Sequence, residues 1–214
     1  ALVVILGVLP AWGLLVCWVL YLSLSVAGQA FLEFQWDALL LEAGLLAVLL
    51  APRGLRLRSA AAPPSPVMRF LARWLLFRLM FCAGFVKLSS GDPVWRNLTA
   101  LRYHYGTQPL PPWTAWFAQQ LPPWFQTLSC AAMFGIELAV PFFIFGPRRL
   151  RLFAFGAFVF LQGAIAATGN YAFFNLLAVA LTLPLLDDAV FPRRWREREG
   201  AAGSGSGRRW PRLV

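Results

Sequence analysis

The stretch Arg78–Pro111, RLMFCAGFVKLSSGDPVWRNLTALRYHYGTQPLP, decides how the rest of the chain is interpreted. It begins in an apolar run, passes Lys87, the only lysine, and opens into a polar and aromatic segment that holds His104, the only histidine. Runs of Leu, Ala, Phe and Val lie on both sides of it. A polar segment inside so apolar a chain is the first place to look for function.

The composition is typical of a membrane protein. Hydrophobic residues make up 59% of the chain and charged residues 13%, with a mean hydropathy of +0.64, whereas soluble domains carry about 25% charged residues. The net charge of +10 comes from arginines clustered between apolar runs, which favours loops at an anionic membrane surface over nucleic-acid binding. Cys17, Cys82 and Cys130 lie in apolar runs without metal-ligand spacing, so we expect no disulfide framework and assign no metal and no cofactor.

The apolar segments predict an all-α fold, a polytopic transmembrane helix bundle of five to six spans, because a spanning helix needs about 20 mostly apolar residues. The expected spans cover residues 2–27 with Pro10 tolerated inside, 36–51, 67–88, 125–146, 152–168 and 172–186. No charged leader precedes ALVVILGVLP, so we interpret the chain as a fragment that starts in or near a span. Residues 1–188 form the transmembrane domain, and the basic Gly/Ser/Arg-rich tail 189–214 is expected to be disordered.

The arginine clusters predict a topology. They come after the second, fourth and sixth spans, at residues 53–58, 148–151 and 193–198, and the positive-inside rule makes their side cytoplasmic. One long loop, residues 89–124, then lies on the opposite side together with the turns before the second and sixth spans. These segments share a non-cytoplasmic polar face, made of Gln35, Trp36, Asp37, Asp92, Trp95, Arg102, Tyr103, His104, Tyr105, Asn170, Tyr171 and Asn175.

The long loop is expected to contain two short amphipathic helices. Asp92 is a good N-cap and Pro93 suits the first helical position, so a helix is predicted over 94–105, ended by Gly106. A second is predicted over 113–121. Asn97-Leu98-Thr99 is a glycosylation sequon, which makes Asn97 a possible acceptor if the loop is luminal.

Four polar residues lie near the middle of the predicted spans, where each is costly unless it is paired or faces a cavity. We expect them to meet at one depth of the bundle, with Arg78 neutralised by Glu137 or Glu42. The cluster is either a structural ion pair that fixes helix register or a reaction centre or ion path. Its members are Glu42, Arg78, Glu137 and Gln162.

The end of the third predicted span and the long loop after it each hold one candidate for chemistry. Gly84 would let another helix approach closely. Lys87, on the same helical face, is either an interfacial anchor or a partly buried base. His104 is either a hydrogen-bonded structural residue or a general acid or base. A single histidine makes no complete catalytic set, so no catalytic residue is assigned, and Lys87 and His104 are the candidates if the protein is an enzyme.

Five stretches in this order resemble the membrane portion of the lipase maturation factors. They are FLEFQWDALLLE at 31–42, RWLLFRLMFCAGFVKL at 73–88, NLTALRYHYGTQPLP at 97–111, IELAVP at 136–141 and TGNYAFFNLL at 168–177. The resemblance implies a multi-pass protein of the endoplasmic reticulum membrane that assists folding or assembly of secreted client lipases, such as lipoprotein lipase. A large soluble luminal portion comes after the membrane helices in that family. A prokaryotic source would place the chain in the bacterial inner membrane instead.

A shorter stretch is similar to the multi-helix domain of vitamin K-dependent carboxylases. There a Gly-Val-Lys-Lys-Leu-like run ends an apolar helix and its lysine serves as a base, and Ala83–Leu88, AGFVKL, looks like it apart from an insertion after Gly84. Three hypotheses remain open. The chain is a non-enzymatic maturation factor, a membrane enzyme acting on a lipid-soluble substrate, or a transporter whose buried charges line a path. The client and the oligomeric state are not determined by these patterns.

Overall fold

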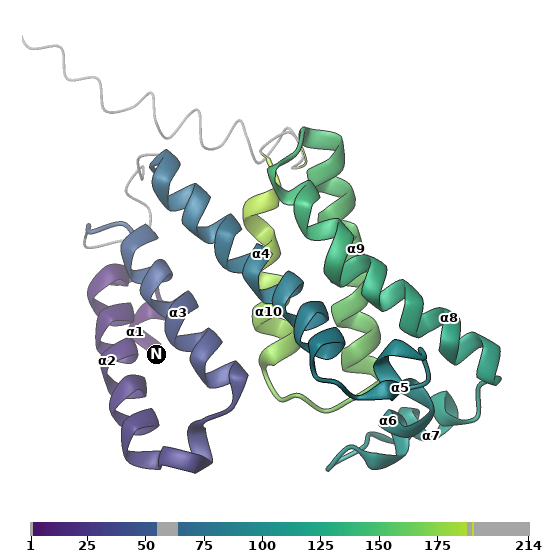
Figure 1. The fold of residues 1–214 in the computed structure, drawn as a ribbon. Coiled ribbons are helices and arrows are strands. Elements are labelled where there is room, and N and C mark those ends of the chain that lie inside the picture. The colour runs from purple at the N-terminus through teal and green to yellow at the C-terminus, as the bar shows by residue number, and fades with distance from the viewer. Residues whose placement is uncertain (1, 55–63, 188–189, 191–214) are drawn as a thin grey trace, which may run out of the picture.

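The computed structural model describes residues 2–54, 64–187 and 190, and within them the regular structure is helical, without strands (Figure 1). The α-helices are α1 (Leu2–Ile5), α2 (Pro10–Gly28), α3 (Gln35–Leu50), α4 (Pro66–Ser89), α5 (Pro93–Arg96), α6 (Leu101–Thr107), α7 (Trp113–Gln119), α8 (Pro123–Phe134), α9 (Arg148–Thr168) and α10 (Phe174–Thr182). Four tighter or wider segments extend them: η1 (Gln29–Leu32), the π-helix η2 (Gly135–Ala139), η3 (Val140–Phe145) and η4 (Leu183–Leu185). The all-α prediction is confirmed for this part of the chain, and the predicted disordered tail lies outside it.

Among the described residues, three helical stretches are long and apolar enough to cross a membrane: Pro10–Leu32, Pro123–Phe145 and Arg148–Thr168. α3 has 16 residues and the α10–η4 helix 12, short of the usual span. α4 is 24 residues long but carries Arg69, Arg73, Arg78 and Lys87. The prediction of five to six spans, and of the side on which each loop lies, therefore stays a prediction.

The first predicted span is interrupted where continuity was expected. Gly7 and Leu9 have positive φ angles of 69° and 47°, which turn the chain between α1 and α2. Pro10 then occupies the first turn of α2, where its missing N–H costs no hydrogen bond and its fixed φ suits a helix start. The expectation that Pro10 lies inside one continuous helix over 2–27 was wrong, because Pro10 begins a new helix.

α4 is the central element of the bundle. It contacts α3, α10, η2 and η3, and its buried side chains Leu76 and Met80 join Ile144, Phe158 and Leu185 in the main apolar core. Each of these five side chains is almost fully inaccessible, so the core joins α4 to η3, α9 and η4, which come more than fifty residues later in the chain. α4 thereby fixes the position of the polar loop at its end.

The loop after α4 folds into short helices at one end of the bundle, opposite the end at which α4 begins (Figure 1). The predicted helix over 94–105 is instead split into α5 and α6, because Leu98 adopts a left-handed conformation with φ 56°. Asp92 caps α5 by accepting a 3.0 Å hydrogen bond from the Val94 N–H, as expected. Buried Gln126 holds the turn between α7 and α8 by donating to the carbonyls of Gln119 and Leu121, both at 3.1 Å.

Candidate functional site

An ion pair between α4 and η2 is the centre of the candidate site. Lys87, in the last turn of α4, places Nζ 2.7 Å from both carboxylate oxygens of Glu137. The glutamate side chain is only 5% exposed and the lysine side chain 25%. A carboxylate buried this deeply is stabilised by its cation and by charge-assisted hydrogen bonds. Glu137 would be an unpaired buried charge without Lys87.

Gly84 brings the two helices close enough for this pair. A Cβ atom at Gly84 would lie 2.8 Å from Leu138 Cδ2 and 3.0 Å from Glu137 Cβ, closer than carbon atoms normally pack. Gly84 is three residues before Lys87, so both lie on the same face of α4. The close approach predicted for Gly84 is therefore present, and it is made by the helix that carries Glu137.

The glutamate lies in a π-helical turn. η2 continues directly from α8, and its hydrogen bonds span five residues rather than four. Such turns bulge outward by one residue and are frequent at functional sites. Here the wide turn presents Glu137 to α4 while the preceding residues of α8 pack against the loop, where Cys130 and Phe134 contact Trp95 and Leu98.

Trp95 of α5 covers the ion pair from the loop side. The Lys87 ammonium lies 5.7 Å from the centre of its indole ring, within the range of a cation–π interaction. The same ring meets Phe134 edge-on, with ring centres 6.1 Å apart. Lys87 thus contacts an acid from one helix and an aromatic ring from another, and its charge stabilises the junction of α4, α5 and η2.

His104 joins the loop to the turn before α10. Its Nε2 lies 3.1 Å from the hydroxyl of Tyr171, and the two rings are nearly parallel. Gln108 adds a second tie by donating to the carbonyl of Thr168 at 2.8 Å. α6 is therefore held against the end of α9 by two polar side chains, and the sequence-predicted approach of the loop to Asn170 and its neighbours is present here.

The electrostatics around His104 favour its neutral form. Burial, and to a smaller extent the charge of Lys87, lower the pKa of His104 below its ordinary value. Burial likewise raises the pKa of Tyr105 and of Tyr171. All three side chains are half-buried and uncharged at neutral pH. Depending on its tautomer, a neutral His104 can accept a hydrogen bond from the Tyr171 hydroxyl or donate one to that oxygen, and neither arrangement places a charge at the junction.

The four polar residues that were predicted to meet at one depth of the bundle do not do so. Glu42 of α3 pairs with Arg78, whereas Glu137 pairs with Lys87. Arg78 and Lys87 are nine residues apart on α4, about 13 Å along the helix axis. The expected single cluster is instead two separate ion pairs at different heights along that helix. Gln162 is buried on α9, and its Oε1 has no hydrogen-bond partner among the described residues.

The first turn of α3 contacts α2. Asp37 is 2% exposed and accepts a hydrogen bond from the Tyr21 hydroxyl, while Trp36 stacks on Phe34 with ring centres 4.6 Å apart. Gln35 is the first residue of α3. The hydrogen bond of Asp37 connects the first turn of α3 with α2, and neither of these contacts reaches Lys87 or His104.

The remaining residues of the predicted face are dispersed. Arg102 donates to Thr127 Oγ1 at 3.3 Å, and its own carbonyl accepts from Gln119 at 2.7 Å. Tyr103 and Asn170 are exposed, and Asn175 is buried. Asn97 is exposed at the end of α5, so its use as a glycosylation acceptor stays a prediction. In the described ranges, no three His, Cys, Asp or Glu side chains gather where a metal ion would fit.

Two contacts of the site were not predicted from the sequence. The Lys87–Glu137 pair was missed because Arg78 was the nearer expected partner by depth, and the π-helical turn changes which way Glu137 points. Trp95 was placed on the polar face but not over Lys87. A signal was present in the SSGDP turn at 89–93, since a turn this short returns α5 to the end of α4.

Comparison with known proteins gives the family. The model of the lipase maturation factor transmembrane domain matches residues 1–193. The chain is 55% identical over 196 residues to lipase maturation factor 2 of Gallus gallus, covering 90% of this chain and 27% of that protein. It is 54% identical over 184 residues to lipase maturation factor 2 of Homo sapiens, covering 81% of this chain and 26% of that protein.

The chain belongs to the lipase maturation factor family. Lipase maturation factor 1 of Bos taurus is also similar, at 39% identity over 174 residues, 81% of this chain and 31% of that protein. The chain thus spans about a quarter of the length of the curated lipase maturation factors it matches first. Every residue of the site described above lies within the matched transmembrane domain. No solved structure matches this chain.

Proposed function

We propose that this chain is the membrane part of a protein that assists the folding or assembly of secreted lipases. The observation that carries the proposal is the match of the lipase maturation factor transmembrane domain to residues 1–193. We further place the protein in the membrane of the endoplasmic reticulum as a multi-pass protein. The vertebrate relatives at 54–56% identity favour that membrane over a bacterial inner membrane.

The arrangement at the loop end suits a structural role for the membrane part. Lys87 is paired with Glu137 and lies over the ring of Trp95, and His104 holds α6 against the turn before α10. Both side chains that would carry chemistry are therefore used in joining the loop to the bundle. The loop, held to the bundle by these contacts, exposes Tyr103, Trp113, Trp116 and other side chains. These side chains could contact another portion of the protein or a client.

Complementation tests the proposed function. The full-length protein is expressed in cells from which the endogenous lipase maturation factors have been deleted, and the activity of secreted lipoprotein lipase is divided by its secreted mass. We expect the full-length protein to restore this specific activity. A full-length protein that is made, folded and located in the endoplasmic reticulum, yet restores none of it, would contradict the proposal.

A membrane enzyme acting on a lipid-soluble substrate is the second candidate. It is favoured by one observation: the only lysine and the only histidine of the chain both lie at the loop end of the bundle, Lys87 in the last turn of α4 and His104 in α6. Exchanging Lys87 for Arg distinguishes the two, because arginine keeps the ion pair with Glu137 but cannot act as a base near neutral pH. A structural role predicts that lipase maturation survives Lys87→Arg, and loss of maturation in a folded variant would favour the enzyme.

A further inference from the structure

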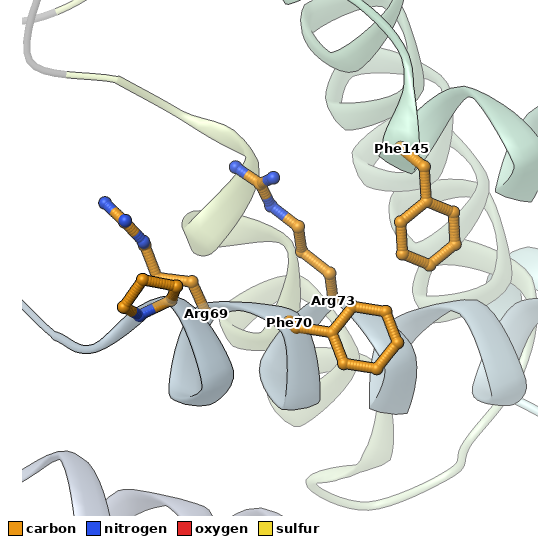
Figure 2. A pocket seen from close by; sticks show the side chains of 5 residues that line it. Arg69, Phe70, Arg73 and Phe145 are labelled. Carbon is orange, nitrogen blue, oxygen red and sulfur yellow. The ribbon is translucent and has the colours of Figure 1, made fainter.

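A cleft with arginine and phenylalanine walls lies at the other end of α4. It has a volume of about 270 Å³ and is lined by Pro66, Arg69, Phe70 and Arg73 of α4 and by Phe145 of η3. Figure 2 shows the guanidinium groups of Arg69 and Arg73 extending from the same side of the helix, with the ring of Phe145 to the right of Arg73. The cleft is remote from Lys87, since Arg73 and Lys87 are fourteen residues apart on α4.

The arginines of the cleft are crowded by like charge. Arg69, and Arg151 from the first turn of α9, both lie close enough to Arg73 to oppose its charge. Within the described ranges neither Arg69 nor Arg73 has a carboxylate partner, whereas Arg148 and Arg151 share Asp187. The Nε–H of Arg73 and that of Arg151 are buried without an acceptor. An arrangement of this kind is stable when an anion supplies the missing charge and acceptors.

The side chains that line the cleft indicate which kind of anion would bind there. Arginine presents a planar fork of donors that matches the oxygens of a phosphate. The rings of Phe70 and Phe145 are 52% and 45% exposed and lie 6.1 Å apart, so an apolar surface continues beside the two guanidinium groups. A free phosphate would use only the arginines, whereas a phospholipid would also cover the rings. Basic pockets between membrane helices at the membrane surface hold lipid headgroups in this way.

We propose that the cleft between α4 and η3 binds the phosphate of an anionic phospholipid, through Arg69 and Arg73, with Phe70 and Phe145 contacting its glycerol and first acyl carbons. The bound lipid would join the start of α4 to the end of η3 and supply the negative charge that faces Arg69 and Arg73. This is a specific binding site, distinct from the general attraction of a basic protein surface to an anionic leaflet.

Lipid binding to the purified full-length protein tests the site. The protein in neutral detergent is titrated with phosphatidylserine or phosphatidylinositol, with phosphatidylcholine as the neutral comparison, and bound lipids are counted by native mass spectrometry. The double variant Arg69→Gln/Arg73→Gln is expected to bind the anionic lipids about tenfold more weakly, since it removes charge-assisted hydrogen bonds. The matched control Arg53→Gln/Arg149→Gln removes two exposed charges outside the cleft and is expected to bind as the unmodified protein does.

Three outcomes would overturn the proposal. Equal losses in the cleft variant and the control would mean general electrostatic attraction. Binding that millimolar inorganic phosphate displaces completely, and that Phe145→Ala leaves unchanged, would mean a site for free phosphate. No anionic lipid retained above phosphatidylcholine would mean no site. If the glutamine variant fails to fold, Arg69→Lys/Arg73→Lys keeps the charge and removes the fork, and it is expected to weaken binding several-fold, where general attraction predicts no change.

Discussion

At the scale of single residues, Lys87 and Glu137 form an ion pair whose two side chains differ in burial. The glutamate side chain is 5% exposed and the lysine side chain 25%, so the two charges depend on each other to different degrees. Lysine has a flexible stem and can carry its ammonium toward polar surroundings when it loses its partner. The buried carboxylate is fixed in the π-helical turn and cannot do so.

Removing the lysine should therefore destabilise the protein more than removing the charge of the acid. We expect Lys87→Met to cost about 3–5 kcal/mol, the usual penalty for leaving a buried charge unpaired, and Glu137→Gln to cost less. Thermal unfolding in detergent measures both. Arg96→Met, at an exposed position on the next helix, is the control. If Lys87→Met and Glu137→Gln lowered the stability equally, the difference in burial would not determine the cost of breaking the pair.

His104 should make stability depend on pH. Its folded-state pKa is lowered by burial and by Lys87, so between that value and the unfolded value near 6.5 the unfolded chain binds more protons. Its contribution is fully present above about pH 6.5 and is lost as the pH falls toward the lowered pKa, by at most about 1.4 kcal/mol per pH unit. Melting temperatures from pH 7.5 to 5 should fall less steeply for His104→Gln. If the melting temperatures of the unmodified protein and of His104→Gln fell equally with pH, His104 would not contribute to the pH dependence of stability.

At the scale of elements, the contact between α4 and η2 depends on the absence of a side chain at Gly84. The helices meet there through Leu138 and Glu137, and the same contact sets the distance over which Lys87 reaches its acid. Glycine within a helix ordinarily lowers stability by about 1 kcal/mol relative to alanine. At position 84 the close approach of η2 makes glycine more favourable than alanine.

Gly84→Ala should consequently destabilise the bundle by about 1–3 kcal/mol, the usual cost of overpacking. The control is Gly163→Ala in α9, where a Cβ would meet no atom within 4 Å, and it should be neutral or stabilising by up to about 1 kcal/mol. The two melting temperatures, measured under the same detergent conditions, should move in opposite directions. A stabilising Gly84→Ala would mean that α4 and η2 separate freely.

Element ends were predicted from the sequence where a residue type determines the backbone, and missed where packing does. Asp92 and Pro93 begin α5 as expected, because a side-chain cap and a fixed φ act locally. Leu9 and Leu98 adopt left-handed conformations that leucine disfavours in isolation, so their residue type did not predict those turns. The partner of Glu137 was missed because it was chosen by depth alone, whereas the π-helical turn also changes the direction of the side chain.

At the scale of the whole molecule, the two ends of the bundle differ in chemistry. The start of α4 and the start of α9 bring Arg69, Arg73, Arg148 and Arg151 to one end, and α5, α6 and α7 lie at the other (Figure 1). The predicted topology assigns the arginine end to the cytoplasm and the loop end to the lumen. The core between the ends was predictable as apolar, but the order of its helices around α4 was not.

Cysteine labelling tests this topology. In a full-length protein in which every cysteine, including Cys17, Cys82 and Cys130, is replaced by Ala, Arg149→Cys and Asn170→Cys place single exposed thiols at the two ends of α9. In sealed microsomes, an impermeant maleimide should label the first variant directly and the second only after the membrane is permeabilised. Labelling of both from the same side would mean that α9 does not cross.

The π-helical turn at Gly135–Ala139 has a consequence for the whole helix Pro123–Phe145. A turn with an added residue rotates the later half of a helix relative to the earlier half. The first half directs Cys130 and Phe134 toward the loop cluster, and the second directs Val140 and Ile144 into the main core. The two halves of this helix therefore pack against different neighbours, in different directions around the helix axis. Deleting one residue within the turn would bring the buried faces of both halves to the same side, and one of the two neighbours would lose its contacts.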